Sequence, residues 1–399
     1  MAEPASKTRV ASVEWIRVFA AACVVMFHFE QLYFGEHRYF ENMAVVVDFF
    51  FLLSGFLLMK SVVTKKAKEQ QARALASSAS ALAAPASAST QTTEGPTNSL
   101  AQSLAESLLY VFRKAKSFYP AYLLAFIMVF ILTTITMQMT DFGEIMARLF
   151  HFKWEALLLQ MAGFIPDPHF NVDYLVGSAW YLSAMLLAMI PVYFLARHCQ
   201  KAYTNAIAPL AALFVYCFFM QSFGTINAGN EMVGFVMSGT LRAFAGLSVG
   251  CICCALYERV SAAKWSRAAT VGASIIEVLC ILSVACLILL RGWITAPDLL
   301  FWVPVFAVLV FFCFCSKTAV ARLLNTRAVR VAVYLGKLSL YVYLFHWFFV
   351  LFFVQYVQGL DYLPGQLAYG TCVVLFSAAM MFLFERLGRY FKSRRLQAE

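Results

Sequence analysis

The chain has 399 residues, of which 62% are hydrophobic and only 13% are charged, and its mean hydropathy is +0.74. This composition excludes a soluble domain and indicates a helical membrane protein. The formal net charge of +10 would suit a nucleic-acid partner. Its distribution along the chain instead follows membrane topology, so no nucleic-acid partner is expected.

Apolar stretches of about 20 residues recur along the chain, each long enough to cross a bilayer as a helix. We predict ten such spans, at residues 13–34, 44–63, 116–138, 178–196, 206–222, 235–257, 269–290, 299–316, 334–356 and 366–387. The predicted fold class is an all-α polytopic membrane protein. Its membrane domain covers 13–390, with a short N-terminal segment at 1–12 and a basic tail at 391–399.

Lys and Arg residues fall unequally on the two sides of this arrangement. Nearly all of them lie in the N-terminus, the tail and alternate loops. The other side carries Arg38, Arg148, Lys153 and Arg291. By the positive-inside rule, this asymmetry predicts that both termini are cytoplasmic.

Two long loops interrupt the spans. Residues 64–112 turn to Ala, Ser, Thr and Gln and predict a low-complexity cytoplasmic linker. The outer loop at 139–177 contains an amphipathic stretch at 145–164. Such a stretch predicts a segment that either lies in the membrane interface or re-enters the bilayer. Because the other outer loops are short, any chemistry is expected among the helices.

Cysteines and known sequence motifs give no sign of a metal or nucleotide site. Nearly all of the eleven cysteines fall within predicted spans and none in an outer loop, so no disulfide framework is expected. The run Cys251-x-Cys253-Cys254 has no second group of ligands nearby and predicts packing, so no metal is expected. Walker A, dinucleotide-binding, HExxH and Gly-x-Ser-x-Gly motifs are absent from the sequence.

Arg17 and His28 lie inside the first predicted span, eleven residues apart. On an α-helix that spacing is about three turns and roughly 16 Å, so both side chains project from one face at two depths. Ionisable groups inside a membrane are costly and indicate function. An imidazole can take a proton from a hydroxyl, and a guanidinium can bind a phosphate or a carbonyl oxygen. The alternatives are a histidine satisfied by a neighbouring helix and an arginine that snorkels to the headgroups.

Further polar residues lie in later spans. Asp48 opens the second span, where its carboxylate either orients an imidazole or simply starts a helix. The nearby Gly55 predicts close helix packing. Arg242, in the sixth span, needs a partner or a polar cavity, for which Glu231 or a ligand is a candidate. His346, in the ninth span, is a second intramembrane histidine.

A basic cluster formed by Arg113, Lys114 and Lys116 precedes the third span. Such a cluster either grips phosphates or simply obeys the positive-inside rule. Trp180 lies at the outer start of the fourth span, where an aromatic-belt role is the ordinary one.

Several motifs occur in an order typical of one family. They are Arg17-x10-His28, an FFxLSGF-like run over 48–56, Tyr119-Pro120-Ala121-Tyr122, Trp180-x-Leu182-Ser183 and an LYxYLFHW-like run ending in Tyr341–Trp347. Over about 13–390 the chain resembles the acyltransferase-3 family of integral-membrane O-acyltransferases, which modify bacterial surface glycans and related acceptors.

The resemblance implies a ten-helix domain in the bacterial inner membrane. It would take an acyl group, usually acetyl, from coenzyme A on the cytoplasmic side and pass it to a hydroxyl on the outer side. His28 would be the catalytic base and Arg17 would position the donor or the transition state, and we predict Asp48 as a further catalytic residue. We predict contacts to acetyl-coenzyme A from Arg113, Lys114, Lys116, Tyr119 and Arg242, and contacts to the saccharide acceptor from Trp180, Ser183 and His346.

Two features depart from the family pattern. The family often has Arg-x-x-Arg before its Tyr-Pro, and here those positions are Lys114 and Ser117. Many relatives carry Glu where this chain has Met185. Two other functions stay open. One is a transporter or flippase for a lipid-linked glycan, with the intramembrane charges as its substrate path. The other is acyl transfer to a small molecule or a lipid.

Overall fold

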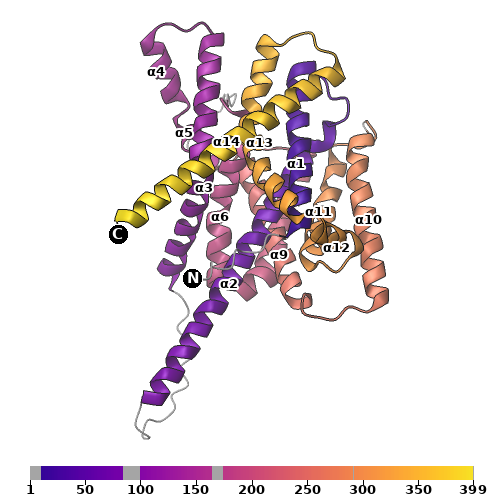
Figure 1. Ribbon diagram of the computed structural model, residues 1–399. Coiled ribbons are helices and arrows are strands. Elements are labelled where there is room, and N and C mark those ends of the chain that lie inside the picture. The colour runs from indigo at the N-terminus through magenta and orange to yellow at the C-terminus, as the bar shows by residue number, and fades with distance from the viewer. Residues whose placement is uncertain (1–9, 84–98, 164–173, 291, 399) are drawn as a thin grey trace.

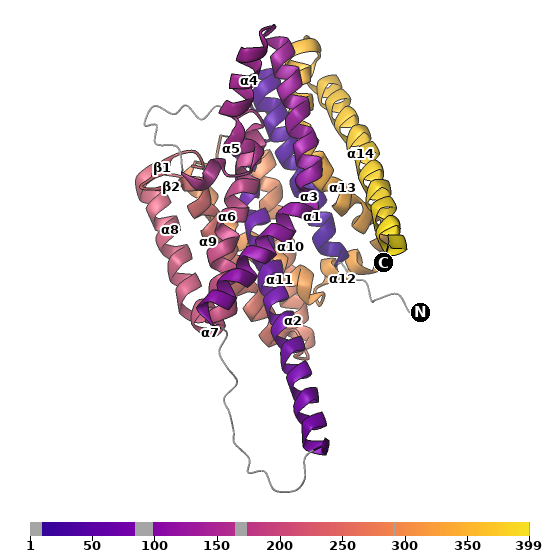
Figure 2. The same cartoon turned by 90° about the vertical axis from the view of Figure 1, so that its left-hand side faces the viewer.

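The computed structural model describes residues 10–83, 99–163, 174–290 and 292–398. This part of the chain is almost entirely helical (Figures 1 and 2), with one small hairpin of β1 (Met232–Val233) and β2 (Val236–Met237). Within these described ranges, ten helical segments are long and apolar enough to cross a membrane, and one predicted span falls on each. The predicted fold class is therefore confirmed. Most of the predicted N-terminal segment lies outside the described residues.

The long helices and their short extensions make the bundle. They are α1 (Ala11–Phe29) with the π-helix η1 (Glu30–Phe34), η2 (Glu41–Val45) with α2 (Val46–Ala83), α3 (Leu100–Thr136), α6 (Trp180–His198), α8 (Ala208–Phe223), α9 (Ser238–Val260), α10 (Arg267–Leu289), α11 (Trp302–Cys315), α13 (Val329–Tyr356) and α14 (Tyr362–Ala398). Shorter elements connect them, namely α4 (Phe142–His151), α5 (Lys153–Ala156), η3 (Gln160–Ala162), η4 (Gly177–Ala179), α7 (Gln200–Ala202), η5 (Tyr203–Ile207), η6 (Pro297–Phe301) and α12 (Ala319–Thr326). We call the end of the bundle that holds Arg113 and Arg197 the basic end.

Helices α2 and α9 pack backbone against backbone. A Cβ atom on Gly55 would lie 2.1 Å from the carbonyl oxygen of Leu247, and one on Gly250 would lie 2.0 Å from that of Leu52. Gly246 and Gly250 lie one turn apart on α9, the small-residue spacing that lets two membrane helices approach closely. The structure thus gives Gly55 the packing role that the sequence predicts.

We expect Gly250→Val to lower the thermal stability of the detergent-solubilised protein. The branched side chain would force the two backbones apart, and overpacking of this kind costs about 1–3 kcal/mol. The matched control is Gly272→Val on α10, where no atom lies within 4 Å of the added Cβ. Equal melting temperatures for the two variants would show that the α2–α9 contact is not tight.

The sequence predicts a low-complexity linker over 64–112, but helix occupies both ends of this segment. Helix α2 continues to Ala83 and α3 begins at Leu100. The Ala, Gln, Lys and Glu residues of these stretches are good helix formers, which explains the helix. The middle of the segment, 84–98, lies outside the described residues. Helix α14 likewise runs through most of the predicted tail.

A cluster of charges joins the two ends of that segment to α6. The guanidinium of Arg197 lies 2.6 Å from Glu69 of α2 and 2.7 Å from Glu106 of α3. Lys65 of α2 lies 2.8 Å from the same Glu106. Because the Arg197 side chain is only 2% exposed, the network fixes α2, α3 and α6 relative to one another at the basic end.

The loop after α3 folds back along that helix. Helix α4 lies beside the far end of α3, and α5 lies further down it (Figures 1 and 2). The phenol of Tyr122 donates to the backbone oxygen of Glu155 at 2.7 Å, and that of Tyr119 donates to Ala156 at 3.2 Å. The loop thus packs on the side of α3, and both predicted arrangements, interfacial and re-entrant, stay open.

Candidate active site

A cavity of about 180 Å³ lies between α1, α2, α3, α6 and α13. The residues of α1 that line it are Arg17, Ala21, Val24 and His28. Their spacing of three or four residues places them on one face of the helix. Lys114 of α3 also lines the cavity. The structure therefore brings both members of the predicted Arg–His pair to a single internal space.

His28 packs against two aromatic rings of α13. Its ring centroid lies 5.4 Å from that of His346, with nearly parallel planes, and 5.1 Å from that of Trp347, edge to face. No hydrogen bond to its imidazole comes from the residues that the structure describes. The imidazole is thus held by ring packing at the cavity wall, with its nitrogens available to a substrate.

His346 is fully buried beside His28. Its Nδ1 lies 2.6 Å from the backbone oxygen of Tyr343. Since a carbonyl oxygen only accepts hydrogen bonds, Nδ1 carries a proton, and a neutral ring then has its lone pair at Nε2. Neither Nε2 of His346 nor Nε1 of Trp347 has a hydrogen-bond partner within the described part of the chain, although both atoms are buried. One acceptor and one donor are therefore unsatisfied next to His28.

Arg17 lies in the half of the cavity nearer the basic end. Its Nη1 is 3.1 Å from the carboxylate of Glu14, one turn earlier on α1, and 27% of its side chain is exposed. Glu14 fits against Gly336 of α13, where an added Cβ would lie 1.9 Å from a carboxylate oxygen. The ion pair holds the guanidinium at the cavity wall.

Asp48 and Arg242 form a buried ion pair, and neither lines the cavity. Both side chains are 1% exposed, with Nη2 2.6 Å from Oδ2. Other donors of the guanidinium reach the Ala44 carbonyl at 3.1 Å and the Asn227 side chain at 3.2 Å. Each charge neutralises the other between α2 and α9, and the predicted roles of the two residues in catalysis and donor binding stay predictions. Asp48, rather than Glu231, is the partner of Arg242.

The basic cluster before the third span divides in two. Lys114 lines the cavity, whereas Arg113 and Lys116 are exposed beside it. Tyr119, predicted to contact the donor, instead turns its hydroxyl toward α5. Only part of the predicted donor-binding set therefore meets at the cavity.

Trp180 lines the cavity, but Ser183 does not. The Ser183 hydroxyl is buried and accepts a hydrogen bond from the backbone N–H of Met161 at 3.2 Å. Sequence analysis missed Tyr181 and Tyr343, which also line the cavity. Tyr343 lies three residues before the predicted His346, so a count along the helix face would have found it.

Met185, one of the departures from the family pattern noted in the sequence, lines the cavity. The hydroxyls of Ser54 and Tyr181 each lie 3.4 Å from its sulfur. A thioether accepts hydrogen bonds only weakly and carries no charge. This wall of the cavity is therefore less polar than it would be with a carboxylate.

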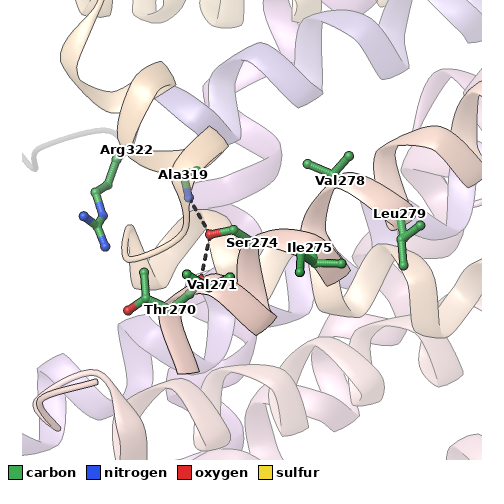
Figure 3. Close-up of a pocket in the computed structure, with 8 residues that line it drawn as sticks. All are labelled: Thr270, Val271, Ser274, Ile275, Val278, Leu279, Ala319 and Arg322. Atoms are coloured by element: carbon green, nitrogen blue, oxygen red, sulfur yellow. Dashed lines mark hydrogen bonds between the residues drawn. The ribbon is translucent and has the colours of Figure 1, made fainter. Parts of the chain in front are cut away.

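A larger hollow of about 470 Å³ lies outside the bundle, between α10 and α12 (Figure 3). Ser274 there accepts a hydrogen bond from the backbone of Ala319 at 3.0 Å and donates to that of Thr270 at 2.7 Å. The other lining side chains are apolar, apart from Thr270 and Arg322. The hollow offers no acid or base among its lining residues. Within the described ranges, no three His, Cys, Asp or Glu side chains gather to hold a metal ion.

Comparison with known proteins gives one finding. A family model described as an acyltransferase domain matches residues 10–385, a range that includes every residue lining the cavity between α1 and α13. No curated protein and no solved structure matches the chain. The match covers nearly the whole sequence, and the chain therefore belongs to the acyltransferase-3 family of membrane acyltransferases.

Proposed function

We propose that the protein transfers an acyl group, acetyl in the first instance, from acyl-coenzyme A at the cytoplasmic side to a hydroxyl of an extracytoplasmic or lipid-linked saccharide. Its place would be the bacterial inner membrane. The observation that carries the proposal is the single cavity lined by both Arg17 and His28, which also includes Lys114 and Ser178. In this proposal, a donor and an acceptor that arrive from opposite sides meet in this cavity between the helices.

The donor enters in this proposal at the basic end. Coenzyme A carries phosphates, which Lys114 and Arg17 can bind through charge-assisted hydrogen bonds. Along α1, Arg17 and His28 are separated by roughly 16 Å. Arg17 therefore holds the donor, while the thioester carbonyl lies nearer His28. Arg242 is unavailable to the donor because Asp48 occupies it.

His28 acts in this proposal as the general base. It takes the proton of the acceptor hydroxyl as that oxygen attacks the thioester carbonyl carbon. A carbon–oxygen bond forms, the carbon–sulfur bond breaks, and the proton passes to the departing thiolate of coenzyme A. Alignment of the two substrates in one cavity supplies a large further part of the rate.

His346 and Trp347 support a place for the acceptor. A hydroxyl can donate to Nε2 of His346 or accept from Nε1 of Trp347, two of the buried atoms that have no hydrogen-bond partner in the described structure. Both rings pack on His28. An alcohol bound there would lie beside the base that deprotonates it.

Purified protein in liposomes, supplied with labelled acetyl-coenzyme A and a saccharide acceptor, tests the proposal. We expect labelled acceptor and an equal amount of free coenzyme A. Movement of a lipid-linked glycan across the bilayer without a covalent product would instead favour the transporter alternative.

We expect Lys114→Ala to raise the KM for acyl-coenzyme A by about tenfold or more, with kcat little changed. A charge-assisted hydrogen bond to phosphate contributes about 1.5–3 kcal/mol, in the ground state and the transition state alike. The control is Lys116→Ala, since Lys116 is exposed and does not line the cavity. The measurement is steady-state kinetics with varied concentrations of acyl-coenzyme A. A wild-type KM in both variants would contradict the role of Lys114 in donor binding.

A further inference from the structure

Glu155 is a buried acid in the loop between α3 and α6, outside the cavity. It lies on α5 and is 3% exposed. One carboxylate oxygen accepts a hydrogen bond from the backbone N–H of Leu175 at 2.8 Å, and the other accepts from Val176 at 2.6 Å. A carboxylate that grips two successive amides fixes the direction of the chain that carries them.

The chain that Glu155 grips leads directly into the cavity wall. Gly177 follows, and an added Cβ there would lie 2.3 Å from a ring carbon of Trp347. The backbone oxygen of Ser178 accepts a hydrogen bond from the phenol of Tyr343 at 2.5 Å. Ser178 and Tyr343 both line the cavity. The segment 175–178 is therefore held between Glu155 on one side and α13 on the other.

We propose that Glu155 is a positioning residue for acyl transfer, and that its carboxylate sets the place of Ser178 and Trp347 around His28. This inference rests on the proposed function. Glu155 does not touch the reacting atoms. It acts through the segment that it holds, and Trp347 is the ring that packs edge to face on His28.

Burial raises the pKa of Glu155 to about 7, and this outweighs the two amide hydrogen bonds, which lower it. Among the described residues, the titratable groups that face it from packed elements are tyrosines. They are Tyr119 and Tyr122 of α3, and Tyr174, whose pKa burial raises above its usual value. Above pH 7 the carboxylate accepts from both amides. Below pH 7 the protonated oxygen is a poorer acceptor, so the hydrogen bonds from the Leu175 and Val176 amides weaken as the pH falls.

The test is Glu155→Gln in the liposome assay, with Glu144→Gln as the control. Glu144 is an exposed acid on α4, in the same loop. For Glu155→Gln we expect kcat to fall by about tenfold with an unchanged KM for acyl-coenzyme A, as expected when a transition-state arrangement is lost. The ionisation near pH 7 in the wild-type rate profile should disappear in this variant. Glu144→Gln should keep both the rate and the profile.

Two further variants keep the inference testable if Glu155→Gln fails to fold. Glu155→Asp retains a carboxylate. Compared with Glu155→Gln, it should have a higher kcat and should keep the ionisation in the rate profile. Gly177→Ala pushes the same segment away from Trp347 and should lower kcat in the same way. An unchanged kcat in Gly177→Ala, or an unaltered pH profile in folded Glu155→Gln, would overturn the positioning role. No transfer by the wild type would overturn the proposed function instead.

Discussion

His28→Ala is expected to lower kcat/KM for acyl transfer by about 10²- to 10⁴-fold, the range that a positioned general base contributes. His28 is the base that lines the cavity on α1, and alanine removes the atom that would accept the proton. The measurement is labelled acyl transfer by the purified variant in liposomes, compared at equal amounts of inserted protein.

The matched control for this prediction is His198→Ala. His198 is exposed at the end of α6 and stacks on Phe194, away from the cavity. This variant should transfer the acyl group at the wild-type rate. If His28→Ala forms product at the wild-type rate, His28 is not the general base.

Asp48→Ala is expected to destabilise the protein by about 3–5 kcal/mol, the cost of leaving one member of a buried ion pair without its partner. Arg242 would keep its charge in a site where both side chains are 1% exposed. The expected signs are a lower melting temperature in detergent and a poor yield of monodisperse protein.

The double variant Asp48→Leu with Arg242→Met separates structure from catalysis. Replacing both members of a buried pair by apolar residues is often neutral or stabilising. We expect the double variant to recover stability and to retain acyl transfer. A folded double variant without activity would show that Asp48 or Arg242 takes part in the reaction, as the sequence predicts.

Local sequence patterns predicted the fold and the shared helix face of Arg17 and His28. Ten spans follow from hydropathy, because each apolar stretch must satisfy its own backbone within the bilayer. The shared face of Arg17 and His28 follows from the helical period alone, and both side chains do line one cavity.

Long-range pairing could not be predicted in the same way. Asp48 and Arg242 are 194 residues apart, and each was a reasonable site residue when considered alone. Glu155 lies in the amphipathic stretch of the loop after α3, and it is buried because that loop folds back along α3. No periodic pattern marks such a residue, since its importance depends on the chain at Leu175 and Val176 arriving beside it.

The glycine-lined crossing of α2 and α9 bears on how substrates gain access. Leu53 and Ser54, which line the cavity, come from the same turn of α2 as Gly55. Where two backbones are in direct contact, no side chain lies between them that could change rotamer. The α2 wall of the cavity is therefore fixed relative to α9. Any widening that admits a bulky sugar must come from displacement of the other helices that line the cavity, α1, α3, α6 and α13.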